Sequence, residues 1–369
     1  MPFGIISRAE GEDTIEVKAK AAVLMDASTG EVLYSFNENE RLYPASVTKI
    51  MPMLLFMEAL DNGKISLTDT VTTSPTAAAK GGSQIWLKEG ETMSVDELLR
   101  ATAIASANDA CTALGEHIAG SEVGFVKMMN DRAKELGMVN TKFVNCSGLD
   151  DDTTEHLTTA YDIALMSKEL LSHERIKTYT TVWMDSLRNG ETQLVNTNKL
   201  VRFYSGTTGL KTGTTSKAGH CLSASAERDG LHLIAVVMGA GNSTDRFEGA
   251  KVMLNWGFAN FETVTPQIDS SLFGDVEILR GVEESIRPVI TGVKPITLKA
   301  GEKNQLKTEI NLSESVEAPV EKNQTLGTVT LKIGDKEIAR YNLVSENFVE
   351  KTNIGHIIVR FFRCLAKSA

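Results

Sequence analysis

The chain has 369 residues, of which 42% are hydrophobic, and this length allows two domains that each bury a core. Charged residues make up 23% of the sequence, so the composition is that of a globular protein rather than a disordered one. The formal net charge of -10 argues against a nucleic-acid-binding protein, and no stretch reaches the roughly 20 apolar residues of a membrane-spanning helix.

The N-terminal part of the chain contains strand signals followed by a helix signal. Residues 1–20 lack a usable signal peptide, because the apolar run FGII is too short and Arg8 follows it; taken alone, this predicts a cytoplasmic protein. Two short strands are expected within 21–36, on either side of the turn sequence DASTG. Residues 46–60 have apolar side chains every three or four positions and predict an amphipathic helix, with an irregular first turn or a kink at Pro52.

The middle of the chain is mostly helical and contains one β-hairpin. Ser94 followed by Glu97 is a capping pattern for the start of a helix. The apolar runs within 219–240 flank Asp229-Gly230, which is a strong signal for a two-residue hairpin turn. Helices are expected over 94–106, 108–120, 122–138, 158–172 and 243–258.

The sequence pattern changes near Glu262. Residues 264–344 contain short alternating stretches such as SIRPVI, PITLKA, TEINL and TLGTVTLKIG, separated by Gly and Pro, and they predict a second, all-β domain. The expected organisation is therefore a first domain over 18–261, a β-rich domain over 262–345 and a separate tail over 350–369.

Four cysteines are spread widely along the chain: Cys111, Cys146, Cys221 and Cys364. No two of them have the spacing of metal ligands, and their number is low for a disulfide framework. The first three are expected to be small buried side chains, and neither a cofactor nor a metal is expected.

Ser46 and Lys49 are three residues apart at the start of the predicted helix 46–60, so their side chains share one face, with Cβ atoms about 5–6 Å apart. A serine hydroxyl needs a base to act as a nucleophile, and a lysine can be that base if burial lowers its pKa. Free backbone N–H groups in the first turn of a helix can hold an oxyanion. Taken alone, however, the tetrapeptide favours a helix N-cap followed by a solvated lysine.

Two further short motifs follow. Ser106 and Asn108 lie at the junction of two predicted helices, where a hydroxyl and an amide can both face a cleft; a capped turn between helices is the alternative. The tripeptide KTG, 211–213, leads into Thr214, and β-branched residues around a glycine indicate a strand that another segment approaches closely. An edge strand with a polar face is the alternative for this motif.

The order S-x-x-K, S-x-N and K-T-G is more specific than any single motif, and this set occurs in penicillin-binding proteins and class A β-lactamases. The chain resembles the D-alanyl-D-alanine carboxypeptidases among the low-molecular-mass penicillin-binding proteins, also in stretches such as YPASVTKIM, SANDACTALGEHIAGS and TGLKTGTTSKAGHC. The resemblance is dense over 18–260. It implies an α/β (α+β) fold in which helices flank an antiparallel sheet, with a helical subdomain and a small all-β domain after it.

The resemblance also implies a role for each motif residue. Ser46 would be the acylated nucleophile, Lys49 would take its proton, and Ser106 would relay a proton to the leaving amine. The backbone N–H groups of Ser46 and Thr214 would form the oxyanion hole. The implied substrate-binding residues are Asn108, Lys211, Thr212, Gly213, Thr214 and Arg246.

Arg246, which precedes KVMLNWGF, would bind the terminal carboxylate of the substrate, because a guanidinium matches a carboxylate with two hydrogen bonds. Without the resemblance, an exposed helix residue would be the ordinary interpretation. The chain departs from many relatives at Ser147, where they have a histidine, and at Pro52; neither departure is expected to touch a motif residue.

The activity that the resemblance implies is removal of the terminal D-alanine from peptidoglycan stem peptides ending in D-Ala-D-Ala, with β-lactams as covalent inhibitors and a role in cell-wall biosynthesis and cell shape. A serine β-lactamase is one alternative, but the E-x-x-L-N pattern of that class is not found between Asn108 and Lys211. A catalytically silent cell-wall-binding module is the other, and the three complete motifs argue against it.

The tail, 350–369, combines an apolar helical face with a basic polar side. This pattern favours an amphipathic helix that lies on a membrane surface; a terminal helix packed on the β domain is the alternative. Together with the resemblance, it predicts a protein outside the cytoplasm, attached to the outer face of the cytoplasmic membrane. The apolar residues are Ile354, Ile357, Ile358, Phe361, Phe362 and Leu365, and the basic ones include Arg360, Arg363 and Lys367.

Overall fold

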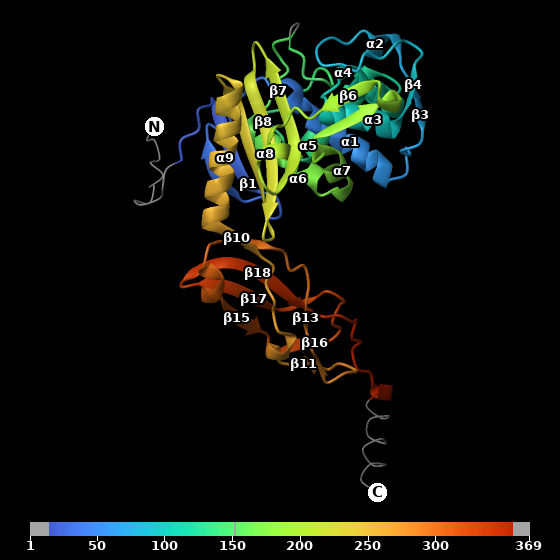
Figure 1. Ribbon diagram of the computed structural model, residues 1–369. Coiled ribbons are helices and arrows are strands. Elements are labelled where there is room, and N and C mark those ends of the chain that lie inside the picture. The colour runs from blue at the N-terminus through green and yellow to red at the C-terminus, as the bar shows by residue number, and fades with distance from the viewer. Residues whose placement is uncertain (1–14, 151–152, 357–369) are drawn as a thin grey trace, which may run out of the picture. The chain divides into compact units, whose positions relative to one another are not determined.

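The computed structural model of the chain describes residues 15–150 and 153–356. The chain divides into two compact units, Met1–Asn260 and Phe261–Ala369 (Figure 1). Most of the predicted amphipathic tail, together with Cys364, lies outside the described residues. None of the helices in the described ranges combines the length and the apolar character that crossing a bilayer requires.

The first unit contains an antiparallel sheet of five strands in the order β2-β1-β9-β8-β7. The predicted hairpin is formed by β8 and β9, and its turn residues Asp229 and Gly230 have φ of 50° and 82°, as a two-residue primed turn requires. β7, which carries the K-T-G motif, lies at an edge of the sheet. The strands are β1 (Ala21–Asp26), β2 (Val32–Phe36), β7 (Thr207–Thr215), β8 (Gly219–Arg228) and β9 (Leu231–Ala240).

Helices cover both faces of this sheet, because alternate residues of each buried strand point to opposite sides. The side chain of Leu233 on β9 packs against Gly257 of helix α9 (Ser243–Asn260). The packing is so close that a Cβ atom at position 257 would lie only 2.6 Å from the Leu233 side chain. On the other face, Ser223 of β8 is hydrogen-bonded to Ser167 of α6 (Ala160–Leu171) across 2.8 Å. The sheet therefore lies between α9 and a second helical layer that contains α6 (Figure 1).

Helix α1 (Ile50–Asp61) differs from the sequence-based expectation. The helix predicted over 46–60 is present as η1 and α1, but it is not amphipathic, because α1 lies inside the unit and is buried on most of its circumference. The expected irregular turn is present as the 3₁₀ helix η1 (Ala45–Lys49), which runs directly into α1. Pro52 is the third residue of α1, where its missing N–H removes no helical hydrogen bond.

The remaining helices of the first unit form a subdomain around α1, α3 and α4. The predicted capping box of α3 is present, with Ser94 and Glu97 bonded to each other's backbone N–H. The subdomain also carries two antiparallel strand pairs: β3 with β4, which residues 73–91 connect, and the hairpin β5–β6. The sequence did not indicate them because their strands have only three or four residues. The elements are α2 (Pro75–Ala78), α3 (Val95–Ile104), α4 (Asn108–Ala119), α5 (Glu122–Glu135), η2 (Glu174–Ile176), α7 (Lys177–Thr180), η3 (Arg188–Gly190), α8 (Leu200–Phe203), β3 (Thr70–Thr72), β4 (Thr92–Ser94), β5 (Met184–Leu187) and β6 (Thr192–Val195).

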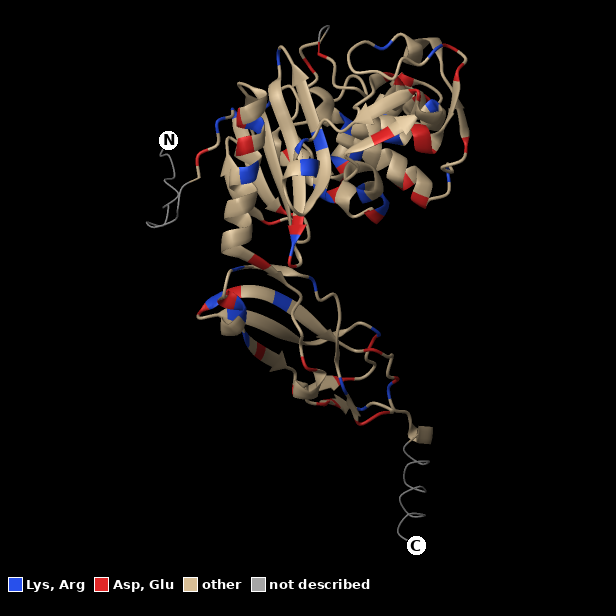
Figure 2. Cartoon of the chain, in the orientation of Figure 1, with Lys and Arg blue, Asp and Glu red and all other residues tan. Residues whose placement is uncertain are grey.

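The second unit is built from short strands around its own apolar clusters, as predicted. Its sheets have the orders β10-β14, β12-β11-β16 and β13-β18-β17-β15, and its described helical turns are η4 (Ser270–Leu272) and η5 (Glu302–Gln305). Acidic and basic residues are interspersed in both units (Figure 2). The strands are β10 (Phe261–Val264), β11 (Val276–Leu279), β12 (Ser285–Ile286), β13 (Val289–Ile290), β14 (Ile296–Lys299), β15 (Lys307–Leu312), β16 (Ser315–Glu317), β17 (Thr325–Ile333) and β18 (Lys336–Val344).

Candidate active site

Ser46 and Lys49 lie on η1, and their side chains face each other. The Nζ atom of Lys49 donates to the Oγ atom of Ser46 across 3.0 Å. Lys49 is fully buried, whereas Ser46 is half-buried and therefore open to a ligand. The structure thus excludes the solvated lysine that was the alternative explanation of the S-x-x-K tetrapeptide.

The ammonium group of Lys49 has three hydrogen-bond acceptors, which use all of its protons. Besides Ser46, these are the Oδ1 atom of Asn108 at 2.5 Å and the carbonyl oxygen of Ser147 at 2.9 Å. Burial lowers the pKa of Lys49 to about 8, with only a partial opposing effect from neighbouring groups such as Asp109. A lysine with this pKa can exchange a proton with Ser46 near neutral pH.

Ser106 lies in the short connection between α3 and α4, and Asn108 is the first residue of α4, so the motif lies at the predicted junction of two helices. Ser106 has a φ of 64°, an unusual backbone conformation for a non-glycine residue, and it directly follows the C-terminal end of α3. Asn108 is fixed from two sides, because its side-chain Nδ2 donates to the carbonyl of Gly81 at 2.7 Å while its Oδ1 accepts from Lys49. The S-x-N motif is therefore joined directly to the S-x-x-K motif.

The K-T-G motif lies on β7 and packs against η1. A Cβ on Gly213 would come within 2.8 Å of the Ser46 backbone nitrogen and of the Pro44 carbonyl oxygen, so only glycine fits there. Both interpretations of the motif are therefore correct: β7 is an edge strand, and another segment approaches it closely. Thr214, next along the strand, consequently lies beside the backbone of Ser46.

Two more cations are buried at the same place. Lys211 donates to the Thr212 carbonyl at 2.9 Å, and burial together with the charges of Lys49 and Arg246 lowers the pKa of Lys211 well below its usual range. Arg246 of α9 donates to the Gly213 carbonyl at 3.2 Å and is only 7% exposed, which excludes the alternative of an exposed helix residue.

Among the residues that the structure describes, these cations have no acidic counter-ion. Within the described part of the chain, Lys49, Lys211 and Arg246 form no salt bridge with a carboxylate, and the buried Nε of Arg246 has no hydrogen-bond partner. Burial also lowers the pKa of Arg246. Uncompensated buried positive charge is unfavourable, so an anionic ligand would be bound strongly there.

The sequence did not reveal several residues that support the site. Ser147 was not expected to touch a motif residue, but this prediction is wrong, because its carbonyl oxygen accepts a hydrogen bond from the Nζ atom of Lys49. This contact is made by the backbone and carries no side-chain signal. The His156 ring is hydrogen-bonded across 2.8 Å to the hydroxyl of Thr48, the residue before Lys49. The hydroxyl of Thr197 accepts a hydrogen bond from the Thr212 hydroxyl across 2.7 Å. Cys111, Cys146 and Cys221 are buried and free, as predicted.

The chain matches known protein families over both units. Residues 7–242 match the D-alanyl-D-alanine carboxypeptidase family, and residues 261–351 match the C-terminal domain of penicillin-binding protein 5. The chain is 43% identical over 353 residues to the D-alanyl-D-alanine carboxypeptidase DacF of Bacillus subtilis, covering 94% of this chain and 90% of that protein. It is 36% identical over 358 residues to the D-alanyl-D-alanine carboxypeptidase DacC of Escherichia coli, covering 94% and 89%.

Solved structures show the same relationship. Penicillin-binding protein 5 of Haemophilus influenzae is 32% identical, with a TM-score of 0.84 over 92% of this chain and 100% of that chain. Penicillin-Binding Protein D2 of Listeria monocytogenes, in its ampicillin-bound form, is 33% identical, with a TM-score of 0.61 over 66% of this chain and 99% of that chain. The resemblance and the fold inferred from the motifs are confirmed, and the chain belongs to the D-alanyl-D-alanine carboxypeptidase family of serine hydrolases.

Proposed function

We propose that this carboxypeptidase removes the terminal D-alanine of peptidoglycan stem peptides through an acyl-enzyme on Ser46. The observation that carries the proposal is the 3.0 Å hydrogen bond between Ser46 Oγ and the fully buried Lys49, whose pKa is lowered to about 8 by burial. About a tenth of such a lysine is neutral at pH 7 and able to accept the serine proton. A solved relative from Streptococcus pneumoniae, described as a peptidoglycan synthesis regulatory factor, supports the choice of substrate.

In the acylation step, Lys49 takes the proton of Ser46 as Oγ bonds to the carbonyl carbon of the penultimate D-alanine. The amide C–N bond then breaks, and the leaving amine of the last D-alanine receives a proton that Ser106 relays from Lys49. The N–H groups of Ser46 and Thr214 stabilise the oxyanion, because β7 and η1 bring these backbones together. Water then hydrolyses the ester, and its proton returns Ser46 to the hydroxyl form.

The buried cations would recognise the substrate's terminal carboxylate. Arg246 offers a guanidinium without an acidic partner, Lys211 adds charge, and the Thr212 hydroxyl lies on the same strand. Asn108 and the Gly213 strand backbone would hold the peptide beside Ser46. A carboxylate bound here would replace water and compensate the buried positive charge. The enzyme would therefore prefer peptides that end in a free carboxylate.

The same nucleophile would be acylated by β-lactams, as the ampicillin-bound Listeria relative supports. A β-lactam amide is attacked in the same way as a peptide amide. Because no E-x-x-L-N pattern occurs between Asn108 and Lys211, the chain lacks the glutamate with which serine β-lactamases deacylate. The adduct on Ser46 would therefore persist, and the β-lactamase alternative is disfavoured.

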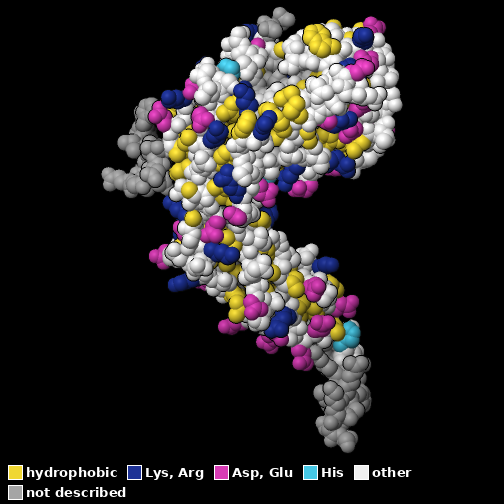
Figure 3. All heavy atoms as spheres, viewed as in Figure 1, with side chains coloured by type: hydrophobic (Ala, Val, Ile, Leu, Met, Phe, Trp, Pro, Cys, Tyr) yellow, Lys and Arg dark blue, Asp and Glu magenta, His cyan; other side chains and the backbone are white. Residues whose placement is uncertain are grey.

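The proposed organisation is a catalytic domain over 18–261, a β domain over 262–345 and a membrane-binding tail over 350–369 that holds the enzyme outside the cytoplasm. Exposed apolar side chains near the start of the tail support this assignment, because they could contact the same membrane surface. Their segments lie beside residue 350, since the backbone N–H of Val282 donates to the carbonyl of Glu350. Hydrophobic side chains also show among charged ones on the second unit in Figure 3. The exposed residues are Leu279, Val282, Phe348 and Ile354.

The test is release of D-alanine from a soluble diacyl tripeptide ending in D-Ala-D-Ala. Wild-type protein should release D-alanine, and Ser46→Ala should not. Turnover of benzylpenicillin without release of D-alanine would favour a β-lactamase. Neither activity, in a protein that is folded by circular dichroism, would favour a catalytically silent binding module.

A further inference from the structure

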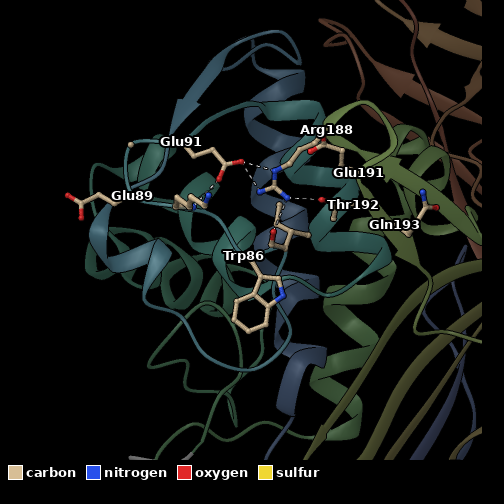
Figure 4. A pocket seen from close by; sticks show the side chains of 10 residues that line it. Trp86, Glu89, Glu91, Arg188, Glu191, Thr192 and Gln193 are labelled. Carbon is tan, nitrogen blue, oxygen red and sulfur yellow. Dashed lines mark hydrogen bonds and ion pairs between the residues drawn. The ribbon is translucent and has the colours of Figure 1, made fainter.

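A second cleft lies in the first unit and contains none of the catalytic residues. It has a volume of about 830 Å³, within the range of small-molecule sites. One wall is the loop 85–91, and the other is formed by residues 188–193 of the β5–β6 hairpin (Figure 4). Most of the lining residues carry polar or charged side chains, and one of them, Trp86, carries a large aromatic ring.

The two walls are held together by Arg188. Its guanidinium donates to the Glu91 carboxylate at 2.8 Å and to the Ile85 carbonyl at 2.9 Å on one wall, and to the Thr192 hydroxyl at 2.9 Å on the other. These contacts are drawn in Figure 4. The cleft is therefore preformed, and a ligand would not have to order it.

Trp86 is presented to solvent by its neighbours. The backbone N–H groups of Ile85 and Leu87 both donate to the buried carboxylate of Asp109, at 3.2 and 3.0 Å. Trp86 between them has a φ of 59° and is 75% exposed. A strained backbone that holds a large apolar ring in water is unfavourable in itself, and such features occur at ligand sites.

The loop that carries Trp86 is also tied to the catalytic centre. The Asn108 N–H donates to the Ser83 carbonyl at 2.7 Å, while the Asn108 side chain contacts Lys49 at 2.5 Å. Ser83 and Ile85 are two residues apart, a span of about 7 Å at most. A substrate that extends away from Ser46 along this loop would therefore reach the cleft.

We propose that the cleft binds the sugar chain to which the stem peptide is attached, with Trp86 as the stacking platform. This inference rests on the proposed function, because it concerns a remote part of the same substrate. A neutral amino sugar offers a flat C–H face for the indole ring, and hydroxyl and acetamido groups for the polar lining. Glu191 and Gln193 on one wall and Glu89 on the other also line the cleft and supply such partners. A protein partner is disfavoured, since the core of such an interface is richer in apolar side chains.

The test compares two soluble substrates in the full-length protein: a disaccharide-linked pentapeptide and the same pentapeptide without sugar. Wild-type kcat/KM should be at least about fivefold higher for the sugar-linked substrate. In Trp86→Ala this ratio should fall to near one, whereas Trp86→Phe should retain most of it. Phe36→Ala is the matched control, because Phe36 is an exposed aromatic residue on β2, at the opposite edge of the sheet from β7.

A direct binding measurement makes the result independent of catalysis. Isothermal titration with a peptide-free tetrasaccharide of N-acetylglucosamine should show binding to wild-type protein and at least about tenfold weaker binding to Trp86→Ala. Equal losses on both peptide substrates would make Trp86 a structural residue and overturn the proposal. So would an unchanged ratio, or an altered sedimentation coefficient of Trp86→Ala without loss of sugar binding, which would indicate a protein contact. Failure of the proposed function would look different, because wild-type protein would then cleave neither substrate.

Discussion

Gly213 lies flat against the backbone of Ser46, so closely that a Cβ at residue 213 would come within 2.8 Å of the Ser46 nitrogen. The three nearest atoms are all backbone atoms, from Pro44, which precedes η1, and from Ser46 and Val47 within it. A flexible side chain could move aside, but this turn is fixed by its junction with α1. The K-T-G glycine therefore sets the distance between Ser46, the proposed nucleophile, and β7, the strand proposed to bind substrate.

Gly213→Ala should slow acylation of Ser46 by about 100-fold, because displacing the nucleophile by a fraction of an ångström to an ångström disrupts its alignment. The free energy of unfolding should fall by about 1–3 kcal/mol through overpacking. Stopped-flow acylation with a fluorescent penicillin and urea denaturation measure the two effects. Gly241→Ala is the control, since nothing lies within 4 Å of a Cβ there. An acylation rate in Gly213→Ala equal to that of wild type would contradict the account.

The pH dependence of acylation should report the titration of Lys49. Burial lowers the pKa of Lys49 to about 8, so if its neutral amine is the base, kcat/KM should rise about tenfold per pH unit below pH 8 and level off above it. The kcat/KM of Lys49→Arg should be about 10²–10⁴-fold lower than that of the wild type, since a guanidinium remains protonated and cannot act as a base. A flat profile between pH 6 and 9, with a fully active Lys49→Arg, would assign the base elsewhere.

Much of this organisation could be predicted from the sequence, and the exceptions have physical causes. The turn at Asp229-Gly230 and the capping box of Ser94 are local features, so short-range chemistry predicts them. The burial of α1 is not local, because its surroundings come from segments far along the chain. The motif residues are recognisable by type, whereas the Ser147 carbonyl is a backbone group that any residue could supply. The cleft beside Trp86 depends on the connection between β3 and β4 and on the hairpin β5–β6, and these strands are too short to have a periodic pattern.

His156 should make the protein sensitive to acid. Burial, with a smaller effect from the Lys49 charge, lowers the pKa of His156 from 6.5 to about 4. The unfolded chain therefore binds a proton below pH 6.5 that the folded protein does not accept until about pH 4. Stability from this residue is complete above pH 6.5, and about 3 kcal/mol is lost as the pH falls to 4.

Urea denaturation at several pH values tests this assignment. His156→Gln should show a shallower loss of unfolding free energy between pH 6.5 and 4 than wild type, although it is less stable at pH 7. The exposed His117→Gln serves as the control and should follow the wild-type slope. Parallel slopes for wild type and His156→Gln would refute the role of this histidine.

Arg246→Ala should lower kcat/KM for a D-Ala-D-Ala peptide. The expected loss of transition-state stabilisation is roughly 2–5 kcal/mol, because the variant removes the guanidinium from the proposed buried pair with the substrate carboxylate. The same peptide with an amidated C-terminus lacks the carboxylate and should be affected much less. Because Arg246 also donates to the Gly213 carbonyl, the melting temperature of the variant must be measured alongside. Equal losses on both peptides would mean that Arg246 only supports the strand.

Removal of residues 354–369 should release the protein from anionic vesicles without changing cleavage of a soluble peptide. Cutting after Asn353 preserves the bridge between Gly281 and Lys351, so the second unit keeps its described contacts. Binding by the intact chain should weaken with salt, because the basic residues of the tail contribute about 1 kcal/mol each near an anionic surface. Full-length protein that stays in the supernatant at low salt in co-sedimentation would end the membrane proposal.

The most direct test of the central claim is to map the residue that benzylpenicillin acylates, by mass spectrometry of proteolytic peptides. If Ser46 is the nucleophile, a single covalent adduct should form on Ser46 and persist on the time scale of the digest. The adduct should be absent from Ser46→Ala and form far more slowly in Lys49→Arg. An adduct on another residue, or one that forms at the wild-type rate without Lys49, would contradict the claim.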